Sequence, residues 1–158
     1  MLFYLEIDLN RSLGERSNVA KIHQVFLDPT GRHCIISLIS TDTQMNYDNI
    51  YLLKKPHQLP KMKGHIINAV GWNFSSCSQI SNSTSNILIG TTKGLIFETQ
   101  LLESDESKFF ATSTPEQYWK QVFDLGFEAG KVTAIEFHKI PSSNSIETAY
   151  FIIVTTKK

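Results

Sequence analysis

The sequence predicts an all-β chain that forms a partial β-propeller of about two to three antiparallel blades. A pair of strand-like segments occurs three times, around Val25, Val70 and Ile135. These positions lie 45 and 65 residues apart, and the first spacing is the length of a four-stranded propeller blade, roughly 40 to 45 residues. In each copy an alternating segment is followed by a continuous apolar one. Recurrence, spacing and internal order therefore all favour stacked blades.

The two strands of each copy differ in their apolar pattern. In the first strand of the second copy, Val70 and Trp72 alternate with smaller or polar residues, which is typical of a strand with one face against a neighbouring sheet. The second strand is an unbroken apolar run, as in 87–89, and predicts a strand buried on both faces. This order indicates an inner strand followed by a fully buried one.

A hairpin is expected after the buried strand. Gly90-Thr91-Thr92-Lys93-Gly94 lacks the order of a phosphate-binding loop, and a hairpin turn accounts for both glycines. Residues 95–99 then predict a third strand. The stretch 102–120 is interpreted as an acidic loop that holds a short helix beginning at Pro115, and it accounts for the longer second spacing.

The whole chain, residues 1–158, is expected to be one incomplete N-terminal propeller domain with blades near 19–55, 64–101 and 131–158. The third blade ends at Lys158 where a turn and an outer strand are expected, so a fragment, an isoform and a truncated gene model all fit. Such an open array is expected to be marginally stable, because each blade buries its faces against its neighbours. Large rings at Trp72 and Phe97 are expected to fill the wedge between blades. The residues expected to build the blades are Val25, Phe26, Val70, Trp72, Ile89, Gly90, Gly94, Phe97, Ile135 and Phe137.

Composition and charge exclude several classes of protein. The sequence has 15 Lys plus Arg, 15 Asp plus Glu, and 41% hydrophobic residues, so it predicts a neutral globular chain. Nucleic acid is excluded as a partner, because phosphate binding needs several cations gathered on one face. The N-terminal apolar run is too short for a signal peptide, and no stretch approaches the roughly 20 apolar residues of a membrane span. A cytoplasmic location is expected.

No pattern predicts catalysis or metal binding. The five histidines lack the spacing of a metal site, and Ser37, Ser40 and Thr41 lack the context of a catalytic nucleophile. We therefore expect no enzyme activity, no catalytic residues, no metal, no cofactor and no small-molecule substrate. A small β-rich enzyme remains an alternative that needs a pocket with perturbed titrating groups. A generic propeller module that binds a peptide on one face is a second alternative, and a truncated product without function is a third.

Motifs in the first two copies point to a family. Gly64-His65 is like the pair that opens many WD repeats, although the Trp-Asp dipeptide is absent, so the fold is WD40-like without the WD dipeptides. The segments Phe26-Leu27-Asp28-Pro29-Thr30-Gly31, Gly71-Trp72-Asn73 and Ile89-Gly90-Thr91-Thr92-Lys93-Gly94 occur in this order. Together they resemble the N-terminal propeller of the vacuolar protein sorting-associated protein 18 (deep-orange) family. The resemblance runs from about Val19 to Thr156.

This resemblance implies a non-catalytic subunit of the HOPS and CORVET complexes, which tether endosomal and lysosomal or vacuolar membranes before fusion. It implies the other class C tethering subunits as partners, and peripheral association with late endosome and lysosome membranes through the complex. Family proteins continue into an α-solenoid and a RING-type zinc domain. The sequence has neither, so no zinc binding or ubiquitin-ligase activity is carried over. Vesicle docking, membrane fusion, endosome organisation and protein transport are the processes the resemblance implies.

Overall fold

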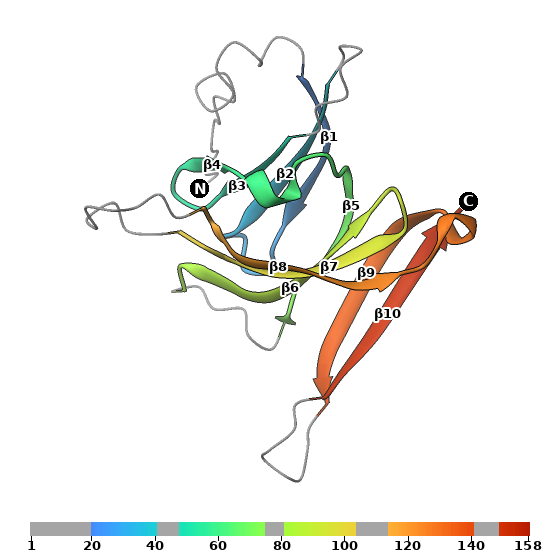
Figure 1. The fold of residues 1–158 in the computed structure, drawn as a ribbon. Helices are drawn as coiled ribbons and strands as arrows, with labels where there is room; N and C mark the ends of the chain where they lie inside the picture. The colour runs from blue at the N-terminus through green and yellow to red at the C-terminus, as the bar shows by residue number, and fades with distance from the viewer. Residues whose placement is uncertain (1–19, 41–47, 75–80, 104–113, 141–148) are drawn as a thin grey trace, which may run out of the picture.

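The computed structural model describes residues 20–40, 48–74, 81–103, 114–140 and 149–158. Within these residues the chain forms three antiparallel sheets (Figure 1). The elements, in order, are β1 (Ala20–Leu27), β2 (Cys34–Ser40), β3 (Asn49–Leu52), β4 (Pro56–Gln58), η2 (Pro60–Met62), β5 (Ile67–Gly71), β6 (Ser83–Thr91), β7 (Leu95–Leu102), β8 (Glu116–Asp124), η4 (Phe127–Ala129), β9 (Lys131–Ile140) and β10 (Ala149–Lys157).

Each sheet is built from strands that are consecutive in the sequence. The first sheet has the order β1-β2-β3-β4, the second β5-β6-β7-β8, and the third is the pair β10-β9. All neighbouring strands run antiparallel, with a register shift within β1 near Ile22 and within β5 near Ile67. The sheets pack face to face, the second between the first and the third (Figure 1). The predicted all-β partial propeller is therefore confirmed.

The predicted buried second strands are buried in both four-stranded sheets. Residues 34–38 of β2 and 87–91 of β6 are buried throughout. The hairpin after β6 turns at Thr92 and Lys93, where the Gly94 amide donates to the Thr91 carbonyl at 3.3 Å. Gly94 has φ +76°, a conformation that L side chains rarely adopt. The turn therefore needs glycine at position 94.

The requirement for glycine at position 90 has a different cause from the predicted one. It lies within strand β6 and not in the turn, and a Cβ built there lies 2.5 Å from Val132 Cγ1 and 2.8 Å from Ile135 Cδ1. The prediction that the hairpin accounts for both glycines was wrong for this one. Gly90 is required because the third sheet approaches the second closely at this point.

The expectation of an acidic loop and short helix over 102–120 was wrong where the structure describes this stretch. Glu116–Asp124 is β8, the fourth strand of the second sheet, and Pro115 precedes it. Residues 104–113 lie outside the described residues. The second sheet consequently extends past 101, the boundary expected for the second blade. Pro115 is compatible with this edge strand because its carbonyl still accepts a hydrogen bond from Leu102 N at 2.9 Å.

Candidate functional site: two seams between the sheets

The contact between the first and second sheets, called here the first seam, is filled by large side chains. Trp72 is 8% exposed and Phe97 is 5% exposed. Phe97 stacks on Trp119 with ring centroids 4.2 Å apart, and the His65 ring meets Phe97 edge-on at 4.9 Å. The other buried members of this core are Ile35, Tyr51, Leu59, Met62, Ile67, Ile87, Ile89 and Leu101, with Phe26 and Val70 partly buried against it. Large aromatic side chains thus set the spacing of the two sheets. Trp72 and Phe97 were expected to lie in this space between the blades.

The contact between the second and third sheets, the second seam, is closer and has smaller residues on one side. Gly71 and Gly90 face Ile135, and a Cβ built at Gly71 lies 2.7 Å from Ile135 Cγ2. Ile135 and Phe137 are 5% and 4% exposed and belong to a core with Ala69, Leu88, Ile96 and Val132. Glycine on β5 and β6 therefore lets the branched side chains of β9 reach the backbone of the second sheet.

Asn68 connects all three sheets through their first strands. Its Oδ1 accepts a hydrogen bond from His23 Nε2 on β1 at 3.2 Å, and its Nδ2 donates to the Val132 carbonyl on β9. Asn68 itself lies on β5. One amide side chain therefore contributes to both seams.

A buried turn before β2 is organised by Asp28. Its Oδ1 accepts the amides of Arg32 and His33 at 2.7 and 2.8 Å, and its Oδ2 accepts the Thr30 hydroxyl at 2.6 Å. Burial opposes ionisation, but these hydrogen bonds and the nearby His33 ring lower the pKa of Asp28. The Asp-Pro-Thr-Gly segment is thus explained by a structural turn.

His33, directly before β2, and Tyr51 on β3 form a buried pair. The Tyr51 hydroxyl lies 2.7 Å from His33 Nδ1, and the two rings stack at 6.0 Å. Burial lowers the pKa of His33 and raises the pKa of Tyr51. Both groups are therefore held neutral at pH 7, and one hydrogen bond joins the tyrosine hydroxyl to the imidazole Nδ1.

At one rim of the first seam, polar groups of the first sheet reach the second. Arg32 Nε donates to the Ser81 carbonyl at 3.0 Å, and its Nη2 donates to Asn82 Oδ1 at 3.1 Å. Glu103 follows β7, and its Oε1 accepts the backbone amides of Lys54 and Lys55 at 3.4 and 3.3 Å. These contacts join residues about 50 positions apart in the sequence.

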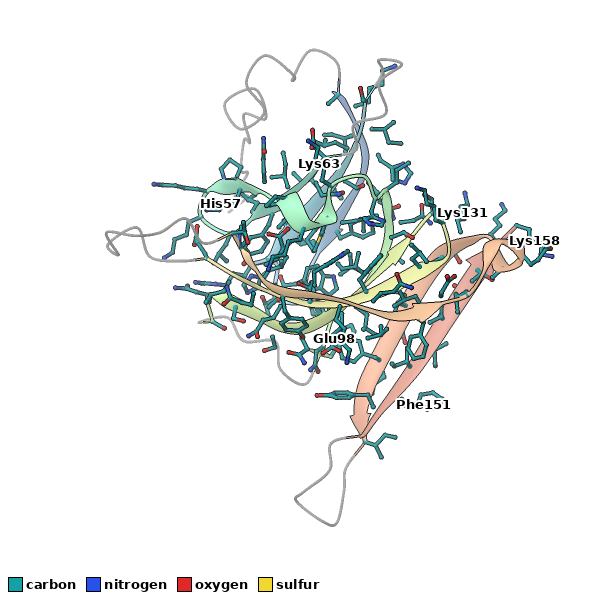
Figure 2. All side chains as sticks on the ribbon, viewed as in Figure 1. His57, Lys63, Glu98, Lys131, Phe151 and Lys158 are labelled. Atoms are coloured by element: carbon teal, nitrogen blue, oxygen red, sulfur yellow. The ribbon has the colours of Figure 1, made fainter. Side chains whose placement is uncertain are left out.

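His57, on β4, lies beside the same glutamate. Its Nε2 lies 3.5 Å from Glu103 Oε1, which is an ion-pair distance and not a hydrogen bond, and the glutamate side chain is only 9% exposed. Figure 2 shows His57 beside β4. Within the described part of the chain, Glu103 Oε2 is buried without a hydrogen-bond partner.

A second glutamate, which is buried, contacts the segment that connects the first two sheets. Glu116 is 1% exposed, its Oε1 accepts the Lys61 amide at 2.9 Å, and Lys61 Nζ donates to the Glu116 carbonyl at 3.0 Å. Its Oε2 is buried and has no hydrogen-bond partner among the residues that the structure describes. Burial raises the pKa of Glu116, although its contacts with Lys61 oppose this.

Two apolar faces remain exposed on the outer sheets. On β1, Val25 is 52% exposed, so this expected blade residue does not contribute to the seam core, and Ile22 and Leu27 are similarly exposed. On β10, Phe151 and Ile153 are 57% and 48% exposed, and Figure 2 shows Phe151 on the third sheet, away from the first two. The described residues thus leave one apolar face uncovered at each end of the array.

A mostly apolar hollow of about 190 Å³ lies between β8 and the third sheet. Val122 and Phe123 line one side, and Phe137, Tyr150 and Ile152 line the other. At its rim Glu98 Oε1 accepts hydrogen bonds from Tyr118 and Asn86, both at 2.9 Å. The hollow is wide enough for one large side chain.

Within the described ranges, no group of three or more His, Cys, Asp or Glu side chains is placed to hold a metal ion. No helix among these residues is long and apolar enough to cross a bilayer.

Nearly the whole sequence is similar to known proteins. Residues 4–158 match the family described as the Pep3/Vps18/deep orange beta-propeller domain. The chain belongs to this Pep3/Vps18/deep orange family. It is 35% identical to the vacuolar protein sorting-associated protein 18 homolog of Danio rerio over 98% of its length, and 30% identical to vacuolar sorting protein 18 of Arabidopsis thaliana over 94%. It spans 15% and 14% of these two relatives. The predicted family resemblance is therefore confirmed.

Membership in the Pep3/Vps18/deep orange family accounts for the paired seams, since propeller blades bury their faces against each other. Several seam residues were not identified from the sequence, namely Arg32, Glu103 and Glu116, together with Asn68. Their contacts reach residues 45 to 64 positions away. No local sequence pattern predicts a polar contact between residues so far apart in the chain.

Proposed function

We propose that this chain forms the propeller part of a non-catalytic subunit of a HOPS- or CORVET-type tethering complex. In this role it contributes to docking and fusion of endosomal vesicles with late endosomes and with lysosomes or vacuoles. The observation that carries the proposal is the family match over residues 4–158. The names of the relatives from Danio rerio and Arabidopsis thaliana support the broader role in vacuolar protein sorting.

The contacts of the polar groups support a role without catalysis. Asp28 holds a turn, His33 is bonded to Tyr51, and Glu103 and Glu116 accept backbone amides. The first two contacts lie within the first sheet, and the two glutamates connect the second sheet to residues 54–61. A catalytic acid or base instead needs to reach a substrate within hydrogen-bond distance.

The exposed apolar faces support assembly with other proteins. Contiguous apolar surface on a folded domain marks an interaction site. We infer that the partners are the other class C tethering subunits, and that membrane association is peripheral and occurs through them. No nucleic acid and no small-molecule ligand is part of this proposal.

The test is affinity purification of the tagged 158-residue chain beside a tagged full-length relative, with partners identified by mass spectrometry. Recovery of the same tethering subunits by both proteins is the expected result. Recovery of chaperones alone, or of proteins unrelated to tethering, would overturn the proposal for this chain.

Paired variants locate the contact. Val25→Ser with Leu27→Ser changes the face of the first sheet, and Phe151→Ser with Ile153→Ser changes the face of the third. All four residues are exposed, so each double variant is expected to fold. Loss of partners in one double variant and not in the other assigns the contact to that face.

A further inference from the structure

The hollow between β8 and the third sheet lies where the second and third sheets part. Of the second sheet, β5 and β6 are the strands on which β9 mainly packs. Among the described residues the third sheet has two strands and the second has four, so β7 and β8 lie largely outside this contact. Tyr150 and Ile152 of β10 line one side of the hollow, and Val122 and Phe123 of β8 line the other. The hollow is therefore built by two sheets.

The lining of this hollow is mostly apolar. Phe137 belongs to it and is 4% exposed, whereas Phe123 and Tyr150 are 47% and 40% exposed. The volume of about 190 Å³ accommodates one large side chain. An apolar side chain placed there removes apolar surface from water on both partners, which is favourable. The hollow is therefore suited to an apolar anchor residue.

Glu98 adds a negative charge to this apolar lining. Among the described residues that line the hollow, Glu98 alone is charged. Its Oε1 accepts the Tyr118 hydroxyl and the Asn86 side-chain amide, both at 2.9 Å. Figure 2 shows Glu98 below the ribbon of the second sheet in this view. Two hydrogen bonds therefore hold the carboxylate in place, and both fall on the same oxygen.

The neighbouring cation does not neutralise this carboxylate. Lys120 on β8 is the cross-strand neighbour of Glu98. The Lys120 side chain is exposed, and among the described residues no ion pair joins it to Glu98. A half-buried carboxylate attracts a cation more strongly than one in bulk water. The charge of Glu98 is therefore available to a ligand, although Lys120 weakens the attraction.

The outer edge of β10 favours an extended ligand. Among the described strands, β10 pairs with β9 alone, and a strand edge presents unpaired amide and carbonyl groups. An extended peptide adds to such an edge through main-chain hydrogen bonds. Its side chains alternate between two faces, so residues two positions apart point to the same side. Two such residues would face the hollow and Glu98.

We propose that the hollow is a docking site for an extended segment of a partner protein, with a large apolar residue and a lysine or arginine two positions away. The apolar side chain fills the space between Val122 and Ile152, the cation lies at Glu98, and the main chain pairs with β10. This site is separate from the outer faces at Val25 and Phe151. It rests on the hollow and its charge, so it stands independently of the tethering role.

The test is an NMR titration of the ¹⁵N-labelled 158-residue chain with a synthetic peptide. The probe is a short serine- and threonine-based peptide that contains one leucine and, two positions later, one lysine. The amide signals of Val122, Tyr150 and Ile152 are expected to shift, whereas those of Val25 and Leu27 remain unchanged. A probe with serine in place of the leucine is expected to bind about tenfold more weakly or less, because the apolar anchor is lost.

Glu98→Gln tests the charge. The glutamine oxygen still accepts hydrogen bonds from Tyr118 and Asn86, so the variant is expected to fold. It is expected to bind the lysine probe about two- to fivefold more weakly, which is the range of a partly exposed ion pair. A probe with glutamine in place of the lysine is expected to bind both proteins equally. Glu136→Gln, at an exposed position on β9, is expected to change neither affinity.

Val122→Phe tests the hollow, because the added ring occupies part of its volume. This variant is expected to lose binding, whereas Gln121→Phe places the same ring on the other face of β8 and is expected to retain it. An absence of shifts at β8 and β10 with the lysine probe, or equal affinities of the unmodified chain for the lysine and glutamine probes, would overturn the proposal. Light scattering of the chain alone tests the remaining occupant. A dimer that Val122→Phe dissociates would also overturn the proposal, since a second copy would then fill the hollow.

Discussion

His23 and Asn68 join the first strands of two sheets, with His23 Nε2 3.2 Å from Asn68 Oδ1. The same Asn68 side chain donates through Nδ2 to the Val132 carbonyl of the third sheet. Removal of the amide therefore breaks two contacts between sheets at once.

Asn68→Ala is expected to lower the free energy of unfolding by about 1 to 3 kcal/mol, because the part-buried Val132 carbonyl loses its donor. Urea denaturation measures the effect. His23→Ala removes only the contact to the first sheet and is expected to cost less, and Gln24→Ala, an exposed position on the same strand, is expected to be neutral. Equal effects of Asn68→Ala and Gln24→Ala would contradict the three-sheet connection.

Gly90→Ala tests the close approach of the third sheet. The added methyl group meets Val132 and Ile135, and overpacking of this kind costs about 1 to 3 kcal/mol. Val132→Ala creates space on the facing strand, so the double variant is expected to lose less stability than the sum of the single variants. A double-mutant cycle measured by chemical denaturation provides the coupling energy, and strict additivity would show that the two residues do not meet.

Phe97→Ala is expected to cost about 3 to 5 kcal/mol, because it empties the centre of the aromatic core in the first seam. Phe151→Ala removes a ring of the same size from an exposed position and is expected to change stability by less than about 0.5 kcal/mol. Thermal or urea unfolding compares the two. Similar losses would show that the seam core does not carry the stability assigned to it.

Tyr51→Phe deletes the hydroxyl that is hydrogen-bonded to His33 and leaves the buried imidazole Nδ1 without this partner. We expect a loss of about 1 to 3 kcal/mol at pH 7. Tyr118→Phe also deletes a tyrosine hydroxyl, which donates to Glu98 Oε1, but this position is less buried, and the variant is expected to cost less.

The stability contributed by His33 depends on pH in a direction that its burial sets. Because its pKa is lowered in the folded state, the unfolded chain takes up the proton first, and stability falls as the pH decreases through the ordinary value near 6.5. His33→Gln is expected to flatten this part of the stability curve between pH 7 and pH 5. A curve of unchanged slope would mean that other groups dominate.

The sequence predicted the sheet architecture because blades repeat a local pattern. The unbroken apolar runs at Ile35 and Ile89 correctly indicated buried strands, since burial on both faces leaves a composition that can be read directly. The sequence did not predict β8, because Glu116–Asp124 has a polar face typical of an edge strand and follows an acidic stretch. Edge strands and loops share this composition.

The polar contacts of the first seam were beyond prediction for a different reason. Glu103 and Glu116 look like ordinary surface acids in the sequence, and only the packing of one sheet on another buries Glu116 and partly buries Glu103. Val25 is the opposite case, an apolar residue that is exposed. The alternating strand pattern predicted that Val25 builds a blade, but burial of its face depends on whether another sheet lies against it.

The two seams differ in how they keep their sheets apart, and this sets different limits on sequence change in the family. A core of large rings and flexible side chains such as Met62 adjusts to substitution by repacking, so the first seam tolerates exchange among bulky residues. The second seam has no such freedom, because backbone at Gly71 and Gly90 touches branched side chains directly. Divergent relatives are therefore expected to vary in the aromatic seam and to retain small residues where β9 crosses the second sheet.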